Sequence, residues 1–441
     1  MLVDDLPKGE FLITNAKIIT CDKVQRVYTQ GDIHIKDGVI ADLGAHLTLP
    51  GINAFDAQGL VALPGLINGH THAGMTLLRG LKDDVDLWEW LNSYIWPAES
   101  CMEPEDIYWG SLLACIEMLK AGVTTFVDMY FHEGETARAV EEIGIRAYLC
   151  RGIIEGRDQG AAGLEETNAL LARWHNGAAG RIKITLGPHA PYTCSIPFLR
   201  RIRDFAIGQD LPVHIHVAET KQEVEKSQRA YGFTPVAMLK RAGLLDPRIQ
   251  LIAAHCVHLT TEDIRLMKEA GVGVVHCLGS NLKLGSGIAP VIELLNAGVK
   301  VCYGTDGAAS NNNLDIIREM RLAALIHNGI SGKPGILPAS QIISMATNHA
   351  AAILKRPDLG SLEIGKRADI VLLDTSGCHW YPREDAVSSL IYSGSWADVD
   401  TVLVNGEFVV HKGKVLTVNE EEVKAQIEKR AWRIKNAKSI V

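Results

Sequence analysis

Short apolar segments rich in β-forming residues alternate with longer segments of helical periodicity between about residue 60 and residue 310. The intervening stretches carry helix start and stop signals: residues 104–120 begin with proline and acidic residues and end before Gly122, and residues 261–270 end before Gly271. Eight β/α units predict a closed (β/α)8 barrel of the TIM type, with a six-stranded doubly wound sheet as the alternative. The eight apolar segments are 60–68, 123–129, 146–153, 182–187, 212–217, 249–254, 272–277 and 299–304.

The two ends of the chain differ from this middle part and resemble each other. Residues 11–19 and 31–40 alternate and turn like hairpins, and so do residues 401–410, in which Asn405-Gly406 is a strong type I′ turn signal. Neither end can form a core alone, so we expect residues 1–62 and 362–441 to pair as one discontinuous β-sandwich domain. Residues 63–361 then form the catalytic barrel domain.

Composition limits the class of protein. With 441 residues, 47% of them hydrophobic, the chain is long enough for one large domain and a smaller one. The net charge of -8 and the absence of a Lys/Arg block argue against nucleic acid or membrane as partners and favour a small-molecule substrate. The nine cysteines form no Cys-x-x-Cys pair, and the sequence shows no signal peptide, so we expect a cytoplasmic protein without a disulfide framework.

His70-Thr71-His72 follows directly after an apolar segment. Side chains at positions i and i+2 of a strand point to the same face, so the two imidazoles can hold one metal ion from one side. Such pairs also occur on solvated strand ends, and the remaining ligands must come from elsewhere. Active sites of these barrels lie at the C-terminal ends of the strands. The polar residues at or just beyond the other predicted strand ends are His189, His214, His216, Glu219, His255, His258 and Asp306.

Each of these residues taken alone is better explained as a hydrogen-bonded core or surface group, and Thr305-Asp306-Gly307 is also an ordinary turn sequence. Their joint position indicates a site, because few folds gather so many titratable groups at one barrel mouth without a use for them.

Several longer motifs resemble those of a known family. The motifs at 64–72, 216–220, 254–258 and 304–307 resemble the amidohydrolase superfamily. The motifs at 75–80, 187–192, 280–285 and 306–311 are similar to those of the 5′-methylthioadenosine/S-adenosylhomocysteine deaminases. The resemblance covers nearly the whole chain, in order.

The resemblance implies one divalent metal ion per chain, held by His70, His72, His216 and Asp306. Three imidazoles and a carboxylate suit zinc, and iron or manganese would accept the same ligands. Binuclear members of the superfamily carry a carbamylated lysine at the end of the fourth strand, where this chain has His189, so we do not expect a second metal.

The resemblance also implies the reaction. A metal of this kind lowers the pKa of bound water from about 15.7 towards roughly 7. Asp306 would accept a proton of that water, His255 would orient the water, and Glu219 would carry a proton to purine N1 as C6 is attacked. The expected activity is hydrolytic deamination of adenine nucleosides: 5′-methylthioadenosine, S-adenosylhomocysteine and adenosine. The alternatives are a related amidohydrolase acting on a guanine, pterin or s-triazine ring, and an inactive scaffold, which would have lost ligands that this chain keeps.

Substrate contacts follow from the same resemblance. Glu99 matches a glutamate that accepts hydrogen bonds from the ribose 2′ and 3′ hydroxyls, although a solvated helix cap would look the same in the sequence. His189 matches a histidine that contacts the purine, and Arg151 matches an arginine of the subfamily. Glu219 and Ser310 are also expected to face the substrate.

The chain departs from the subfamily at the 5′ substituent. S-adenosylhomocysteine carries an α-carboxylate, for which arginine is the best partner. A second subfamily arginine is replaced here by Gly163, and the nearest substitute, Arg157, is better explained as a solvated loop charge beside Asp158. We therefore predict that methylthioadenosine and adenosine are preferred over S-adenosylhomocysteine by about tenfold, which corresponds to one lost charged contact of roughly 1.5 kcal/mol. A homo-oligomer is the default expectation.

Overall fold

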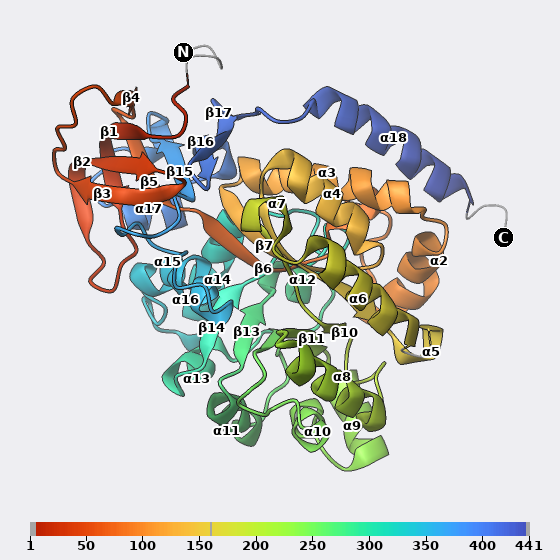
Figure 1. The fold of residues 1–441 in the computed structure, drawn as a ribbon. Helices are drawn as coiled ribbons and strands as arrows, with labels where there is room; N and C mark the ends of the chain where they lie inside the picture. The colour runs from red at the N-terminus through yellow and green to blue at the C-terminus, as the bar shows by residue number, and fades with distance from the viewer. Residues whose placement is uncertain (1–5, 159–160, 438–441) are drawn as a thin grey trace.

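Parallel strands and helices alternate through the middle of the chain in the computed structural model, which describes residues 6–158 and 161–437 (Figure 1). Each of the eight predicted apolar segments overlaps a strand. Segment 60–68 is divided between β5 of the nine-stranded sheet and β6, and segment 182–187 is divided between β9 and β10. One parallel sheet has the order β10-β8-β7-β6, with β9 paired to β8, and a second has the order β11-β12-β13-β14. The strands are β6 (Leu66–Thr71), β7 (Val123–Tyr130), β8 (Arg146–Ile153), β9 (Ile182–Ile184), β10 (Gly187–Pro188), β11 (Val213–Val217), β12 (Leu251–His255), β13 (Gly273–His276) and β14 (Lys300–Tyr303).

The two parallel sheets adjoin at both edges. A parallel bridge between Leu186 and Val213 links the first sheet to β11. At the other edge, beyond β14, the N–H of Asp306 donates to the carbonyl of His70 at 3.0 Å. These two links bring the carboxyl ends of β6 and β11 and the loop after β14 to the same region of the molecule.

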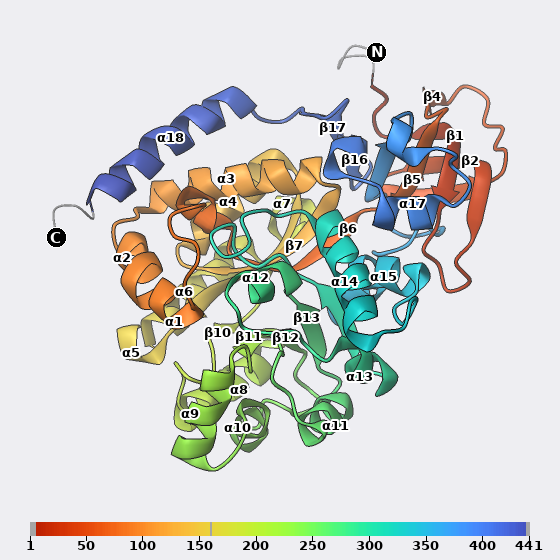
Figure 2. The same cartoon turned by 180° about the vertical axis from the view of Figure 1, so that it is seen from behind.

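Helices lie around these strands (Figures 1 and 2). Helix α3 begins with a capping box between Glu103 and Asp106, and α11 ends at Gly271, whose positive φ of 68° suits a residue without a Cβ. Both predicted helix boundaries are therefore confirmed. The helices of this region are α3 (Pro104–Lys120), α4 (Glu133–Ile143), α5 (Glu155–Asp158), α6 (Ala161–Trp174), α7 (Gly177–Gly180), α8 (Ile196–Gln209), α9 (Lys221–Tyr231), α10 (Pro235–Ala242), α11 (Thr261–Ala270), α12 (Leu278–Lys283), α13 (Val291–Asn296), α14 (Ile316–Ser331), α15 (Ala339–Ala346) and α16 (Asn348–Ile353).

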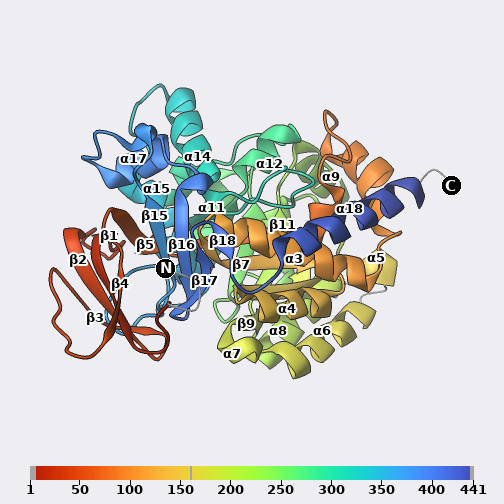
Figure 3. The ribbon, with the colours of Figure 1, turned by 90° about the horizontal axis from the view of Figure 1, so that it is seen from above.

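Strands from both ends of the chain pair in one nine-stranded sheet. Its order is β18-β17-β16-β15-β5-β1-β2-β3, with β4 beside β1, and the antiparallel pair β15–β5 joins the two ends of the chain. Seen from above, the N-terminal strands lie beside the C-terminal ones at one side of the molecule (Figure 3). The strands are β1 (Phe11–Ile19), β2 (Val27–Lys36), β3 (Val39–Gly44), β4 (Asn53–Asp56), β5 (Leu60–Pro64), β15 (Ile370–Asp374), β16 (Val399–Val404), β17 (Glu407–His411) and β18 (Lys414–Val415).

The sheet of the chain ends is anchored to the parallel strands at two points. At the first, β5 passes directly into β6 through Gly65, where a Cβ would lie 2.0 Å from Thr124 Oγ1, so only glycine fits. The second point is a buried ion pair at the start of β8, in which Arg146 Nη2 lies 3.0 Å from Asp369 Oδ1. The same guanidinium donates to Asn405 Oδ1 at 2.6 Å.

The C-terminal helix α18 (Glu420–Ala437) follows β18, the last strand of the nine-stranded sheet, and lies along α3 (Figures 1 and 2). Arg430 Nη1 lies 2.8 Å from Asp106 Oδ1, and Arg433 pairs with the same carboxylate. The expected β-sandwich of residues 362–441 does not include this segment, which is instead a helix held against α3 by charge pairs. The other short helices after residue 370 are η4 (Cys378–Trp380), α17 (Ala386–Tyr392) and η5 (Trp396–Asp398). Within 6–158 and 161–437, no helix has the length and apolar character needed to cross a membrane.

Candidate active site

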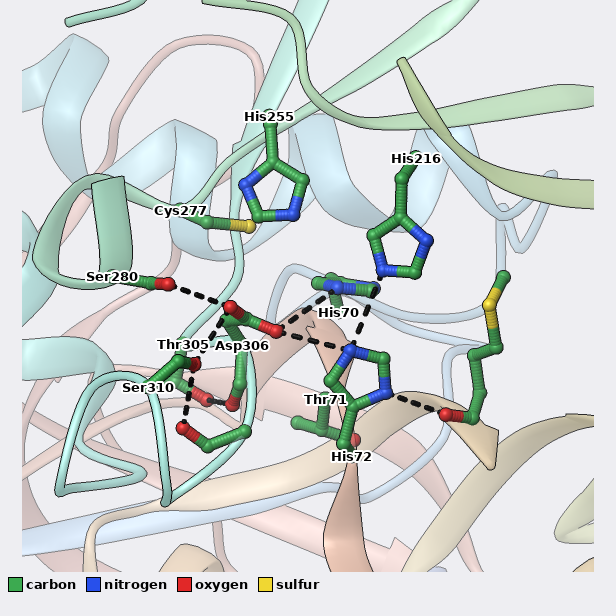
Figure 4. A network of polar contacts seen from close by, with 12 residues as sticks. His70, Thr71, His72, His216, His255, Cys277, Ser280, Thr305, Asp306 and Ser310 are labelled. Carbon is green, nitrogen blue, oxygen red and sulfur yellow. Dashed lines mark hydrogen bonds and ion pairs between the residues drawn. The ribbon is translucent and has the colours of Figure 1, made fainter. Parts of the chain in front are cut away.

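Four of the predicted side chains meet beyond the ends of β6, β11 and β14 (Figure 4). One ring nitrogen from each of His70, His72 and His216 lies within 4.8 Å of the others. Nε2 of His72 lies 3.4 Å from Nε2 of His216. Oδ1 of Asp306 lies 3.3 Å from Nε2 of His70 and 3.1 Å from Nε2 of His72. The structure thus brings the whole predicted ligand set together.

The hydrogen bonds of these imidazoles fit a bound cation. Nδ1 of His72 lies 2.5 Å from the carbonyl of Met129, and Nδ1 of His216 lies 2.6 Å from the carbonyl of His189. Because a carbonyl only accepts, each Nδ1 carries a proton, and Nε2 is left as the nitrogen that can bind a metal ion. The buried Nε2 of His70 has no hydrogen-bond partner among the described residues. Lone pairs that converge beside a carboxylate are the donor set of a divalent metal such as zinc.

Burial and the Asp306 carboxylate set the charges of the cluster. Burial lowers the pKa of His70 to about 4 and holds the pKa of His216 well below its ordinary value. Burial also opposes a charge on His72, but its hydrogen bond with Asp306 outweighs that effect and raises its pKa to about 9. For Asp306, burial is likewise outweighed by the neighbouring imidazoles of His70 and His72, which hold its pKa well below the usual range. Asp306 is therefore an anionic ligand at neutral pH.

Two serine hydroxyls orient Asp306 (Figure 4). Ser280 Oγ and Ser310 Oγ donate to Oδ2 of Asp306 at 2.6 Å and 2.7 Å, which leaves Oδ1 facing the histidines. We expected Ser310 to face the substrate, but it does not line the cavity above the cluster. The hydroxyl of Ser310 instead contacts Oδ2 of Asp306, as does that of Ser280, for which the sequence alone predicts no role.

Glu219 and His255 lie beside the ligand cluster. Glu219 is only 4% exposed, and its Oε2 lies 3.9 Å from Nε2 of His255. Burial raises the pKa of Glu219, and nearby His255 partly offsets that rise. Nδ1 of His255 is held by Asn281 Oδ1 at 2.8 Å, so Nε2 faces Glu219. Both oxygens of Glu223 accept backbone N–H groups, from Ala218 at 3.0 Å and from Glu219 at 2.8 Å, and so fix the loop that carries Glu219.

A cavity of about 430 Å³ opens above the cluster, a volume within the range of small-molecule sites. His72, Glu219 and Asp306 are among its lining residues. One wall comes from the segment after β6, which contains η2 (Ala73–Leu78), α1 (Leu87–Glu89), the π-helical turn η3 (Trp90–Ile95) and α2 (Trp96–Glu99). Trp90 and Leu91 make part of this wall apolar.

The predicted substrate-binding residues Glu99, Arg151 and His189 all line the cavity. Glu99, at the end of α2, accepts a hydrogen bond from the Tyr130 hydroxyl at 2.9 Å. Nδ1 of His189 lies 3.0 Å from Thr193 Oγ1. The three residues come from different elements, as a pocket above a set of strand ends requires.

Arg151 has an acidic neighbour that the sequence analysis did not single out. Its Nε lies 2.8 Å from Oε2 of Glu166, which also lines the cavity. Arg151 is paired with Tyr130 in the register of β7 and β8, so the Arg151–Glu166 pair lies next to the Glu99 side of the cavity. Gly163 lies buried in α6, and the side chain of Arg157 lies outside the described residues.

The chain belongs to the amidohydrolase family, whose sequence profile matches residues 61–409. It is 47% identical over 427 residues to the 5-methylthioadenosine/S-adenosylhomocysteine deaminase of Moorella thermoacetica, covering 96% of this chain and 99% of the relative. It is 43% identical over 425 residues to the 5'-deoxyadenosine deaminase of Methanosarcina barkeri, covering 96% of this chain and 98% of the relative.

The crystal structure of an adenosine deaminase from Xanthomonas campestris with bound zinc superimposes with a TM-score of 0.93 at 34% identity. The match covers 97% of this chain and 99% of that chain. The fold is therefore the TIM-barrel-type α/β fold of the amidohydrolases, and the chain is a metal-dependent hydrolase of that family.

Proposed function

We propose that this protein hydrolytically deaminates adenine nucleosides at C6, with 5′-methylthioadenosine and adenosine as preferred substrates. The observation that carries the proposal is one cavity that joins the ligand cluster, the buried carboxyl of Glu219 and the carboxylate of Glu99. The names of the Moorella and Methanosarcina relatives support the substrate class, and the zinc-bound Xanthomonas structure supports zinc. Iron or manganese would fit the same donors.

The metal ligands in this proposal are His70, His72, His216 and Asp306. A zinc ion bound there would act as a Lewis acid that makes water nucleophilic near neutral pH. Asp306 accepts one proton of the attacking water. Glu219 takes a proton from that water and delivers it to purine N1, for which a buried carboxyl with a raised pKa is suited. His255 orients the water. The proton accepted by Asp306 then passes to the 6-amino group, which leaves C6 as ammonia while C6 becomes the oxo carbon.

The remaining lining residues hold the nucleoside. Glu99 accepts hydrogen bonds from the ribose 2′ and 3′ hydroxyls, and His189 contacts the purine. In this proposal the 5′ substituent lies towards Arg151 and Glu166. The pairing of Arg151 with Tyr130 in the register of β7 and β8 supports this orientation. Glu166 already accepts from Arg151, so an incoming α-carboxylate must compete with it. This supports a preference for uncharged 5′ substituents.

The finer architecture is also a proposal. We propose a closed eight-stranded barrel over residues 63–361 and a domain built from residues 1–62 and 362–441, whose sheet curls into a β-sandwich. The edge links at Leu186 and Asp306 and the β15–β5 pair support this division. We further propose a cytoplasmic homo-oligomer. The reducing location is supported by the nine cysteines, which are all unpaired thiols.

Ammonia release from a panel of substrates tests the function. The panel contains 5′-methylthioadenosine, adenosine, 5′-deoxyadenosine, S-adenosylhomocysteine, adenine and guanine, each with native protein and with chelated protein. We expect turnover of the nucleosides that stops on chelation. Turnover of guanine without turnover of any nucleoside would replace the proposal by its alternative.

A further inference from the structure

His214 is a buried histidine that the proposed reaction does not use. It lies on β11, two residues before His216. Its Nε2 lies 2.9 Å from Nδ1 of His70, and the two rings are perpendicular, at 90°. On its other side, Nδ1 of His214 lies 3.8 Å from the sulfur of Cys150. His70, His214 and Cys150 are each 0% exposed, so solvent cannot supply or accept their protons.

The position of every proton along this chain of contacts follows from one requirement. If His70 binds a metal ion through Nε2, its Nδ1 carries the proton and donates to Nε2 of His214. His214 then carries its own proton on Nδ1, which faces the sulfur of Cys150. The Cys150 thiol in turn donates to the carbonyl of Asp128 at 3.2 Å. This series of hydrogen bonds ends at the carbonyl of Asp128, which can only accept.

His72 and His216 need no such series of hydrogen bonds to fix their tautomers. Nδ1 of His72 and Nδ1 of His216 face the carbonyls of Met129 and His189, which can only accept. A histidine acceptor such as His214 has two tautomers, and one of them would point an N–H at His70. A neighbour beyond His214 is therefore needed to select the tautomer, and Cys150 occupies that place.

We propose that His214 and Cys150 are positioning residues that fix the tautomer and ring orientation of His70 for metal binding. The inference rests on the metal site of the proposed function but not on the identity of the substrate. Outer-shell partners of ligating histidines are typically worth 10- to 100-fold in metal affinity. Without Cys150, His214 could adopt either tautomer, so part of its contribution to metal affinity would be lost.

Zinc affinity, measured by competition with a chromophoric chelator, tests the proposal. His214→Leu removes the acceptor and should weaken zinc binding by about 10- to 100-fold. His214→Gln keeps an acceptor near the position of Nε2 and should stay within about threefold of the native affinity. Cys150→Ser should bind zinc like the native protein, whereas Cys150→Ala should bind it more weakly. Native affinity in His214→Leu, or equal affinity in the two Cys150 variants, would overturn the proposal.

His327→Leu is the matched control. His327 is a buried histidine on α14 whose Nε2 lies 3.3 Å from Nε2 of His276, so it also belongs to a buried histidine pair, but it does not contact the ligand cluster. It should keep native zinc affinity, which separates a positioning effect from a general loss of packing. If His214→Leu does not fold, the Cys150→Ser and Cys150→Ala pair decides the question.

Nitrogen-15 NMR of the zinc-loaded native protein reports which ring nitrogen of His214 carries the proton. A merely structural role for His214 would not specify that nitrogen. His214 should be protonated on Nδ1, and protonation on Nε2 would contradict the inference. Neither measurement needs a substrate. A native protein that binds zinc with this tautomer but releases no ammonia from nucleosides would refute the proposed function and leave the positioning role standing.

Discussion

Replacing Glu219 by glutamine should remove the proposed proton shuttle while leaving the rest of the site in place. The side chain is only 4% exposed, and glutamine has nearly the same volume and can still form hydrogen bonds, but it cannot exchange a proton. Glu219 is not among the proposed metal ligands, so zinc content should be unchanged. General acid–base catalysis contributes about 10²- to 10⁴-fold in rate, which corresponds to roughly 2.7 to 5.4 kcal/mol of activation free energy. We expect a loss of kcat in this range.

The assay is steady-state ammonia release from 5′-methylthioadenosine, with zinc measured in the same sample. Glu225→Gln is the matched control, because Glu225 lies on the next helix, α9, where it pairs with Arg229 at 3.1 Å on the surface. That variant should keep native kcat. A Glu219→Gln enzyme with a full complement of zinc and more than a tenth of the native kcat would refute the shuttle role.

Three further predictions concern the ribose, the 5′ group and the fold. Glu99→Ala should lower kcat/KM for adenosine by about 10- to 100-fold, the equivalent of a charged hydrogen bond, and should affect 2′,3′-dideoxyadenosine much less; equal losses would exclude ribose binding. The native enzyme should prefer methylthioadenosine to S-adenosylhomocysteine by about tenfold in kcat/KM. Glu166→Gln should make this preference smaller, because the α-carboxylate of S-adenosylhomocysteine would no longer compete with the Glu166 carboxylate for Arg151. An unchanged preference would rule out Glu166 as its cause. Asp369→Asn should lower the free energy of unfolding in urea by about 3–5 kcal/mol, because it leaves the buried Arg146 guanidinium without its anion. The control Asp204→Asn, at an exposed position, should lower the free energy of unfolding by less than about 1 kcal/mol. Equal losses of stability would contradict this account of the ion pair.

Local patterns predict the strands of this fold better than its long-range contacts. Most strands of the parallel sheets are short apolar runs between turn signals, and that pattern is visible in the sequence alone. Helix α18 was missed because its docking depends on pairs such as Arg430–Asp106, which join residues far apart in the chain. Only Val423 and Ile434 of α18 are buried, so the helix carries a weak apolar signal.

The same distinction holds in the site. His70, His72 and His216 could be predicted to converge because strand topology alone brings them to one end of the parallel sheets. The role of Ser310 depends on the turn after β14, where Asp306 has a positive φ of 62° and directs Oδ2 at the serine hydroxyl. No periodicity or composition signal specifies such a turn, and the Arg151–Glu166 contact is equally invisible until β8 and α6 pack together.

Mass spectrometry of the product formed in oxygen-18 water tests the central claim most directly. Zinc-loaded native protein should convert 5′-methylthioadenosine to the 6-oxo nucleoside with one labelled oxygen at C6 and one equivalent of ammonia, and chelated protein should form none. Cleavage of the N-glycosidic or thioether bond, or a 6-oxo product formed equally well after the metal has been removed, would contradict the account.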